Sequence, residues 1–131
     1  MNNADVLVVD DDPDLIELVR TMLCCAGYEV RSAANGIEAL EAAAQRMPAI
    51  VLLDVMMPGM DGWECARELR RRYGRSMPIV IVTATAHARA RADQVGGVDD
   101  VLSKPFDMDE LLGVVARFHE PRTLALQSSE P

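Results

Sequence analysis

The sequence predicts an α/β fold, a doubly wound five-stranded parallel sheet in the order 2-1-3-4-5 with helices on both faces, giving three layers. Three observations support this prediction. Short apolar runs alternate with segments whose apolar residues recur at helical spacing. The runs at 6–9, 50–53 and 79–82 are apolar throughout, as in central strands covered on both faces. The run at 28–31 alternates apolar and polar residues, which is typical of an edge strand.

Capping residues and stop signals delimit the predicted helices. The first helix begins at Asp12 with Pro13 in its first turn, and Gly27 ends it. The fourth helix, at 86–97, is the weakest prediction, because its apolar residues are mostly alanines and two glycines end it; a fifth strand is expected at 98–102. The other helices begin at a cap followed three residues later by Glu: Asn35 with Glu38, Asp61 with Glu64, and Asp107 with Glu110.

Each helix should turn one apolar stripe toward the sheet. The inward residues are predicted to be Leu15, Leu18, Val19, Met22, Leu23 and Ala26 in the first helix, Ile37, Leu40 and Ala44 in the second, Trp63, Ala66, Leu69 and Tyr73 in the third, and Met108, Leu111, Leu112, Val115 and Phe118 in the last. Pro48 closes the second helix and Pro121 the last.

Length and composition suit a single globular domain. Residues 1–120 are expected to form it, and 121–131 a polar tail or the start of a linker. No apolar run is long enough to span a membrane and no signal-peptide pattern is present, so residence in the cytoplasm without membrane contact is expected. The three cysteines lack the spacing of a zinc site. A net charge of −8 without an evident basic patch argues against direct binding of nucleic acid.

Polar side chains end four of the predicted strands. Asp10 and Asp11 follow the first strand, Asp54 the third, Thr83 the fourth and Lys104 the fifth. The carboxyl ends of parallel strands meet at one edge, so these groups should converge. Clustered carboxylates attract a hard divalent cation such as Mg²⁺, and a carboxylate can attack phosphorus to form an aspartyl phosphate. The alternative for each residue is structural: a strand end, a turn former or a surface lysine.

The sequence resembles the receiver domains of two-component response regulators. Four ordered motifs carry the resemblance: Val-Val-Asp-Asp-Asp-Pro at 8–13, Leu-Asp-Val-Met-Met-Pro-Gly-Met-Asp-Gly at 53–62, Val-Thr-Ala at 82–84 and Lys-Pro-Phe at 104–106. It covers about residues 4–120. The resemblance implies a flavodoxin-like receiver that accepts a phosphoryl group on Asp54 from a histidine kinase or a histidine phosphotransfer protein. It implies a signalling domain that catalyses only its own phosphoryl transfer and dephosphorylation.

The resemblance also implies roles for the residues around Asp54. Asp11, Asp54 and the backbone carbonyl of Met56 would bind Mg²⁺, for which Mn²⁺ can substitute, with Asp10 beside the metal through water. The phosphoryl group would meet Thr83, the amide of Ala84, and Lys104. The bond before Pro105 is usually cis in this family. The cognate kinase and the output do not follow from the resemblance.

The sequence departs from the family pattern at one position. The family usually has an aromatic residue three positions before the lysine, and this ring moves together with the threonine as a switch. That position holds Val101 here, so Thr83 would have no ring to move with it. We therefore expect the backbone from Ala84 through the fourth helix to take up the change.

Three alternative functions remain at this point. The first is a haloacid-dehalogenase-type phosphatase with Asp10 as nucleophile, although the chain has no cap insertion. The second is a flavodoxin-like cofactor binder, but no phosphate-binding loop follows the first strand. The third is a receiver-like interaction module that is never phosphorylated.

Overall fold

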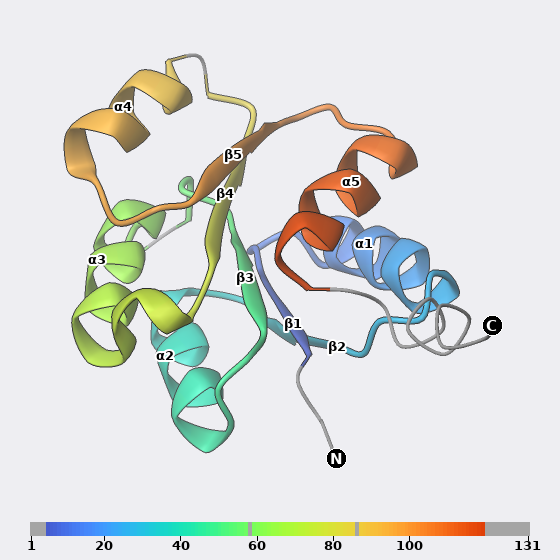
Figure 1. The fold of residues 1–131 in the computed structure, drawn as a ribbon, viewed down its shortest axis with the longest axis horizontal. Helices are drawn as coiled ribbons and strands as arrows, with labels where there is room; N and C mark the ends of the chain where they lie inside the picture. The colour runs from blue at the N-terminus through green and yellow to red at the C-terminus, as the bar shows by residue number, and fades with distance from the viewer. Residues whose placement is uncertain (1–4, 58, 86, 120–131) are drawn as a thin grey trace, which may run out of the picture.

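A computed structural model describes residues 5–57, 59–85 and 87–119 of the chain (Figure 1). The elements are, in order, β1 (Val6–Val9), α1 (Pro13–Cys25), β2 (Val30–Ala33), α2 (Gly36–Gln45), β3 (Ile50–Leu53), α3 (Gly62–Tyr73), the short 3-10 turn η1 (Gly74–Ser76), β4 (Ile79–Thr83), α4 (Ala88–Val95), β5 (Asp100–Ser103) and α5 (Met108–Phe118). The predicted tail at 121–131 and the stop at Pro121 lie outside the described residues.

The five strands form one parallel sheet in the order β2-β1-β3-β4-β5, which confirms the predicted topology. The register aligns Val9 of β1 with Leu53 of β3, so the residues that follow them leave the sheet side by side. At the other side, Thr83 of β4 aligns with Ser103 of β5. The sheet register therefore brings the four predicted strand ends to one edge.

Two hydrophobic cores cover the two faces of the sheet. Figure 1 shows α1 and α5 on one face and α2 and α3 on the other, with α4 beside β5. Leu7, Leu53 and Leu69 are fully buried in the core on the α2 and α3 side. Ile50, Leu23 and Leu111 are fully buried in the core under α1 and α5. Strands β1, β3 and β4 are buried along their whole length, as their apolar composition predicts.

The helix caps follow the sequence prediction closely. Asp61 accepts a hydrogen bond from the Glu64 amide at 2.8 Å, and the Glu64 side chain accepts one from the Asp61 amide at 3.3 Å. Asp107 and Glu110 form the same reciprocal box at 2.8 and 2.9 Å. The box expected at Asn35 differs, because the side chain of Glu38 binds the amide of Ala34.

Some predicted boundaries and inward positions are wrong. The second strand lies two residues later than expected, because the amide of Tyr28 donates to the Leu23 carbonyl at the end of α1, at 3.0 Å. The fifth strand is 100–103 instead of 98–102. Four predicted inward residues are exposed, because each lies at the margin of its helix stripe: Leu18 (49%), Ile37 (55%), Met108 (39%) and Ala44.

Among the residues that the structure describes, no helix has both the length and the apolar character needed to cross a membrane.

Gly62 is required by a close approach of two backbones. A Cβ at this position would overlap the carbonyl oxygen of Asp54 and the Cα of Val55. We therefore predict that Gly62→Ala lowers the free energy of unfolding by about 1–3 kcal/mol, measured by urea denaturation. Gly113→Ala is the matched control, because a Cβ there meets nothing within 4 Å and the helix gains about 1 kcal/mol. Equal effects of the two substitutions would contradict the prediction.

Candidate functional site

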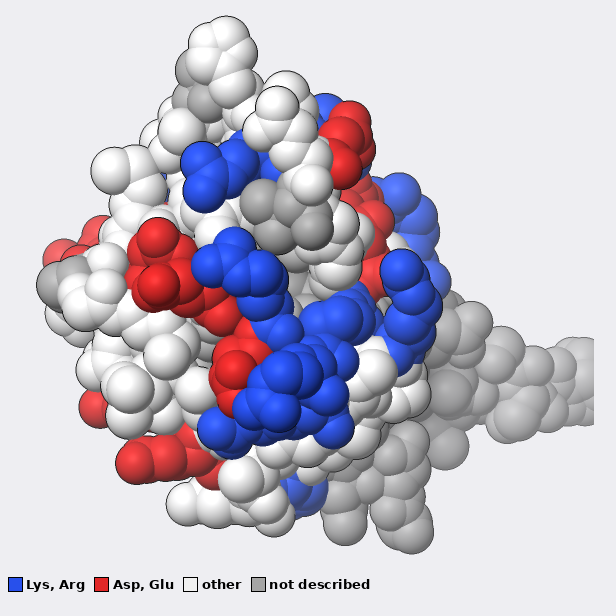
Figure 2. Space-filling model, turned by 90° about the vertical axis from the view of Figure 1, so that its left-hand side faces the viewer, with Lys and Arg blue, Asp and Glu red and all other residues white. Residues whose placement is uncertain are grey.

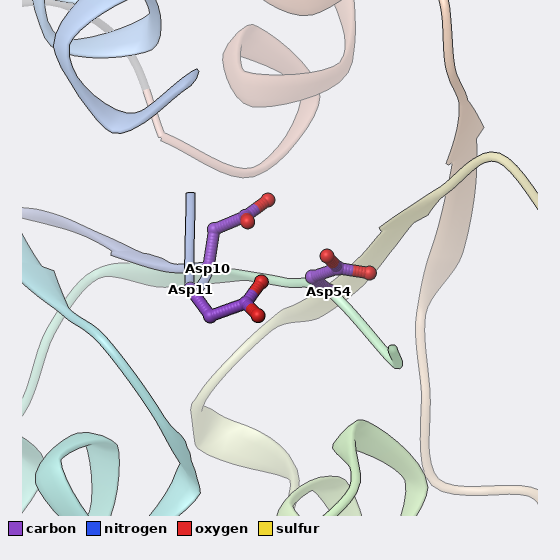
Figure 3. Close-up of side chains that lie close together, drawn as sticks. All are labelled: Asp10, Asp11 and Asp54. Atoms are coloured by element: carbon purple, nitrogen blue, oxygen red, sulfur yellow. The ribbon is translucent and has the colours of Figure 1, made fainter. Parts of the chain in front are cut away.

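Three carboxylates meet where β1 and β3 end. One oxygen atom from each carboxylate lies within 4.8 Å of those from the other two, and Figure 3 shows Asp10, Asp11 and Asp54 grouped at this edge. Asp10 and Asp54 are buried, with 3% and 6% exposure, whereas Asp11 is exposed. The strand ends hold the two buried residues in place, because the Asp10 amide donates to the Ala33 carbonyl at 3.1 Å and the Asp54 amide to the Val9 carbonyl at 3.0 Å.

Lys104 joins the two buried carboxylates from the side of β5. Its Nζ lies 3.1 Å from Oδ2 of Asp10 and 3.4 Å from Oδ2 of Asp54. Burial acts to lower the pKa of Lys104, but the hydrogen bond to Asp10 and the charge of Asp54 together raise it above its usual value. The lysine is therefore an ammonium ion at neutral pH. The Lys104–Pro105 peptide bond is cis, as the resemblance implied.

Backbone amides satisfy the second oxygen of each buried carboxylate. Oδ1 of Asp10 accepts a hydrogen bond from the Asp12 amide at 2.9 Å, and Oδ1 of Asp54 accepts one from the Met56 amide at 3.0 Å. One oxygen of each carboxylate thus faces a backbone N–H, and the other faces Lys104.

Thr83, at the end of β4, lies next to Lys104, which follows the neighbouring strand β5. Thr83 is 1% exposed, and its carbonyl accepts the amide of Lys104 at 2.9 Å. Its hydroxyl lies 3.1 Å from the hydroxyl of Thr85, whose amide donates to it at 3.2 Å. Ala84 between them is exposed. Sequence reasoning missed Thr85, although a second hydroxyl two residues after Thr83 was the signal for it.

Met56 and Val101 stand at the margin of this site. The Met56 side chain is 65% exposed, and its sulfur accepts a hydrogen bond from the Thr85 hydroxyl at 3.0 Å. Val101 is partly buried and packs against the core on the α2 and α3 side. Its small side chain therefore belongs to the sheet packing of β5.

The donor set fits a hard divalent cation. All three acidic side chains offer oxygen, and the exposed Asp11 leaves the site open to solvent and to further oxygen ligands. Mg²⁺ requires such ligands, and in proteins it keeps several waters while one or two carboxylates bind it.

A model of the response regulator receiver domain matches residues 6–116. This chain is a response regulator receiver domain. Among curated relatives, it is 45% identical over 108 residues to the response regulator MprA of Mycobacterium sp. (strain KMS), covering 82% of the chain and 46% of the relative. It is 37% identical over 112 residues to the "DNA-binding dual master transcriptional regulator RpaA" of Synechocystis, covering 84% and 46%. The receiver chain thus spans about half the length of these relatives.

Solved receiver structures agree with this assignment. Chemotaxis protein CheY4 of Vibrio cholerae superimposes with a TM-score of 0.80 at 34% identity, covering 88% of this chain and 98% of that one. Response regulator TrrA of Thermotoga maritima, solved in complex with Mg(2+)-BeF, gives 0.81 at 35% identity, covering 88% and 99%.

Membership in the receiver family decides among the functions that the sequence left open. The chain is a phosphorylation-dependent receiver of two-component signalling, and neither the phosphatase nor the unphosphorylated module is favoured. Receiver domains bind Mg²⁺ through an acidic cluster and interact with histidine kinases, and the cluster of this receiver has the residues for the metal.

Removing one carboxylate should weaken the metal site of this receiver. We predict that Asp11→Asn lowers the affinity for Mg²⁺ at least about tenfold, because the site loses a full charge and an oxygen ligand. Titration followed by Trp63 fluorescence or amide chemical shifts measures it. Asp14→Asn is the control, since Asp14 is exposed in the first turn of α1 and outside the cluster. Unchanged affinity in Asp11→Asn would remove Asp11 from the coordination shell.

Proposed function

We propose that Asp54 is the phosphoacceptor of this receiver and that Asp10 is not. The position of Asp54 carries the proposal: it directly follows β3, which lies between β1 and β4. It therefore has acidic neighbours from β1 on one side and the β4 strand end with Thr83 on the other. Nζ of Lys104 lies closer to Oδ2 of Asp10, at 3.1 Å, than to Oδ2 of Asp54, at 3.4 Å. Oδ2 of Asp54 is therefore the more weakly hydrogen-bonded of the two oxygens.

The proposed reaction is a transfer from phosphohistidine to this oxygen. Oδ2 of Asp54 attacks phosphorus, the phosphorus–nitrogen bond breaks, and its electron pair stays on the imidazole nitrogen of the donor. The ammonium of Lys104 offsets the negative charge on the phosphoryl oxygens, and Thr83 with the amide of Ala84 donates hydrogen bonds to them. Mg²⁺ or Mn²⁺, held by Asp10, Asp11, Asp54 and the Met56 carbonyl, would supply further charge neutralisation.

An apolar groove beside the site suits the phosphohistidine donor. It has a volume of about 370 Å³ and borders Lys104. Its lining explains why Leu18 is exposed on α1, because this side chain forms one wall of the groove instead of packing inward. A helix of a histidine kinase or of a histidine phosphotransfer protein can bury these residues while its histidine reaches Asp54. The lining residues are Leu15, Leu18, Ala84, Lys104, Pro105 and Phe106.

The receiver modifies only itself in this proposal. Asp54 is both the attacking group and the modified residue, so the domain turns over no separate substrate. A role in relaying a signal from a kinase also agrees with residence in the cytoplasm, where such donors present their phosphohistidine.

Phosphorylation of site variants tests the assignment of Asp54. We predict that acetyl phosphate with Mg²⁺ adds one phosphoryl group to the native chain, and that the Asp54→Asn protein is not phosphorylated. Intact mass spectrometry measures both. Asp10→Asn should keep Asp54 as the modified residue, at a lower rate, because the nucleophile remains. A label that survives in Asp54→Asn and vanishes in Asp10→Asn would assign the phosphatase-like nucleophile instead.

The switch prediction concerns α4. The N-cap of this helix is His87. Its φ of 68° is left-handed, and its side chain makes no cap hydrogen bond. Its buried side chains, among those that the structure describes, are the small residues Ala88 and Ala92. Such a segment lies at the low-stability end of a fold and can adopt a second arrangement at little cost.

Hydrogen exchange measures this response. Addition of beryllofluoride and Mg²⁺ should change amide protection most between Ala84 and Gly97, because Val101 has few rotamers with which to follow Thr83. Amides of α1 and α5 serve as the internal control. A larger change in those helices than in 84–97 would contradict the account of the switch, whatever the result at Asp54.

A further inference from the structure

An arginine-rich segment stands out in this acidic chain. Residues 67–75 contain five arginines and one glutamate, a charge of +4. The whole chain carries −8, so the other 122 residues carry −12. The segment forms the end of α3 and the turn η1. We call its arginines the arginine patch: Arg67, Arg70, Arg71, Arg72 and Arg75.

The fold gathers these side chains on one surface. Figure 2 shows Lys and Arg side chains concentrated on the face formed by α3 and α4, with acidic side chains at the margin. A shallow hollow of about 490 Å³ lies within the patch. Arginines of the patch line it together with Gly96 and Gly97 of the loop before β5. The sequence-based expectation of no basic patch is therefore wrong, because net charge averages over surfaces that the fold separates.

Part of the patch is engaged within the protein. Arg70 donates to the Gly97 carbonyl at 2.8 and 2.6 Å and pairs with Asp99 at 2.8 Å, so it holds the loop before β5 against α3. Arg71 and Arg72 both pair with Glu68. The two guanidinium groups hold the pKa of Glu68 at about 2, mainly through their hydrogen bonds to it. The patch thus already keeps one carboxylate ionised.

Arg67 and Arg75 remain available for a partner. Both are exposed, and neither side chain makes a hydrogen bond or ion pair with the residues that the structure describes. They lie on α3 and η1, at opposite ends of the segment, and both line the hollow. Each guanidinium group can bind a carboxylate through two parallel hydrogen bonds.

We propose that the arginine patch is a docking site for an acidic, Asp/Glu-rich segment of a partner protein. Carboxylates match the free guanidinium groups in the way that Glu68 already matches Arg71 and Arg72. A long polyanion is disfavoured, because duplex DNA carries a charge about every 1.7 Å and would extend from the patch over the acidic remainder of the surface. A short acidic segment begins and ends within the patch.

The position of the patch leaves the phosphorylation edge free. The patch occupies the end of α3 that precedes β4, whereas Asp54 and Lys104 lie at the edge where the strands end. A partner bound there contacts the loop of Gly96 and Gly97 through the hollow. The receiver can therefore hold this partner and a phosphoryl donor at the same time.

Fluorescence anisotropy with the 131-residue chain tests the proposal. The probe is a labelled hexaglutamate peptide, with a short labelled duplex DNA as the competing class. We expect peptide binding at about 50 mM salt that weakens toward about 300 mM, because exposed charges are screened. Arg67→Gln with Arg75→Gln should weaken it roughly three- to tenfold, since exposed ion pairs contribute modestly. Circular dichroism confirms that this variant is folded.

A charge-matched control separates the patch from net charge. Gly113→Glu with Ala116→Glu also makes the chain two units more negative, but on exposed positions of α5, across the sheet from α3. The control should change peptide affinity less than twofold. Absence of peptide binding at low salt, equal losses in the two variants, or tighter binding of DNA than of peptide would each overturn the proposal.

Discussion

Repulsion among three carboxylates is the constraint on which the site depends. Asp10 and Asp54 are both buried and both within hydrogen-bonding reach of a single cation, Lys104. Counting Asp11, the cluster carries three negative charges and one positive charge, a balance of −2. One divalent cation would neutralise that balance, and it would thereby reduce the repulsion that the cluster exerts on a phosphoryl group. The backbone amides of Asp12 and Met56 bind the other oxygen of Asp10 and of Asp54 and so fix the orientation of both carboxylates.

Backbone geometry positions these charges. The parallel register of β1 and β3 places Asp10 beside Asp54, and the register of β4 and β5 places Lys104 beside Thr83. Gly62 lets α3 start against the backbone of Asp54, where a larger residue would overlap it. The same central strands are the most buried part of the fold. The stability of the core and the geometry of the site therefore rest on the same residues.

The sequence predicted those features that depend on local chemistry or on one dominant pattern. Caps such as Asp61 form within four residues, and fully apolar strands must be central, so both were correct. Sequence-based prediction failed for features that depend on contacts among several elements. Leu18 lies at the margin of the apolar stripe of α1, and it lines a groove made by α1 and the loop after β5. Strand β2 starts later than its alternating pattern indicates, because the amide of Tyr28 is bonded to the end of α1. Thr85 was missed because its contacts join two strand ends: its hydroxyl lies beside that of Thr83 and donates to the sulfur of Met56.

Charge is divided between the two ends of the fold, and α4 lies between them. The acids gather where the strands end, and the arginines gather where α3 ends. Besides the buried Ala88 and Ala92, two exposed arginines attach the helix to its neighbours: Arg89 pairs with Asp100 at 2.9 Å, and Arg91 lies over the ring of Trp63 at 5.6 Å. At its far end, Arg70 holds the loop that carries Gly97. Polar links of this kind can be exchanged at lower cost than packed apolar contacts, because water replaces part of what is lost. The proposed change near Thr83 and the proposed partner near Arg70 would therefore act near opposite ends of α4.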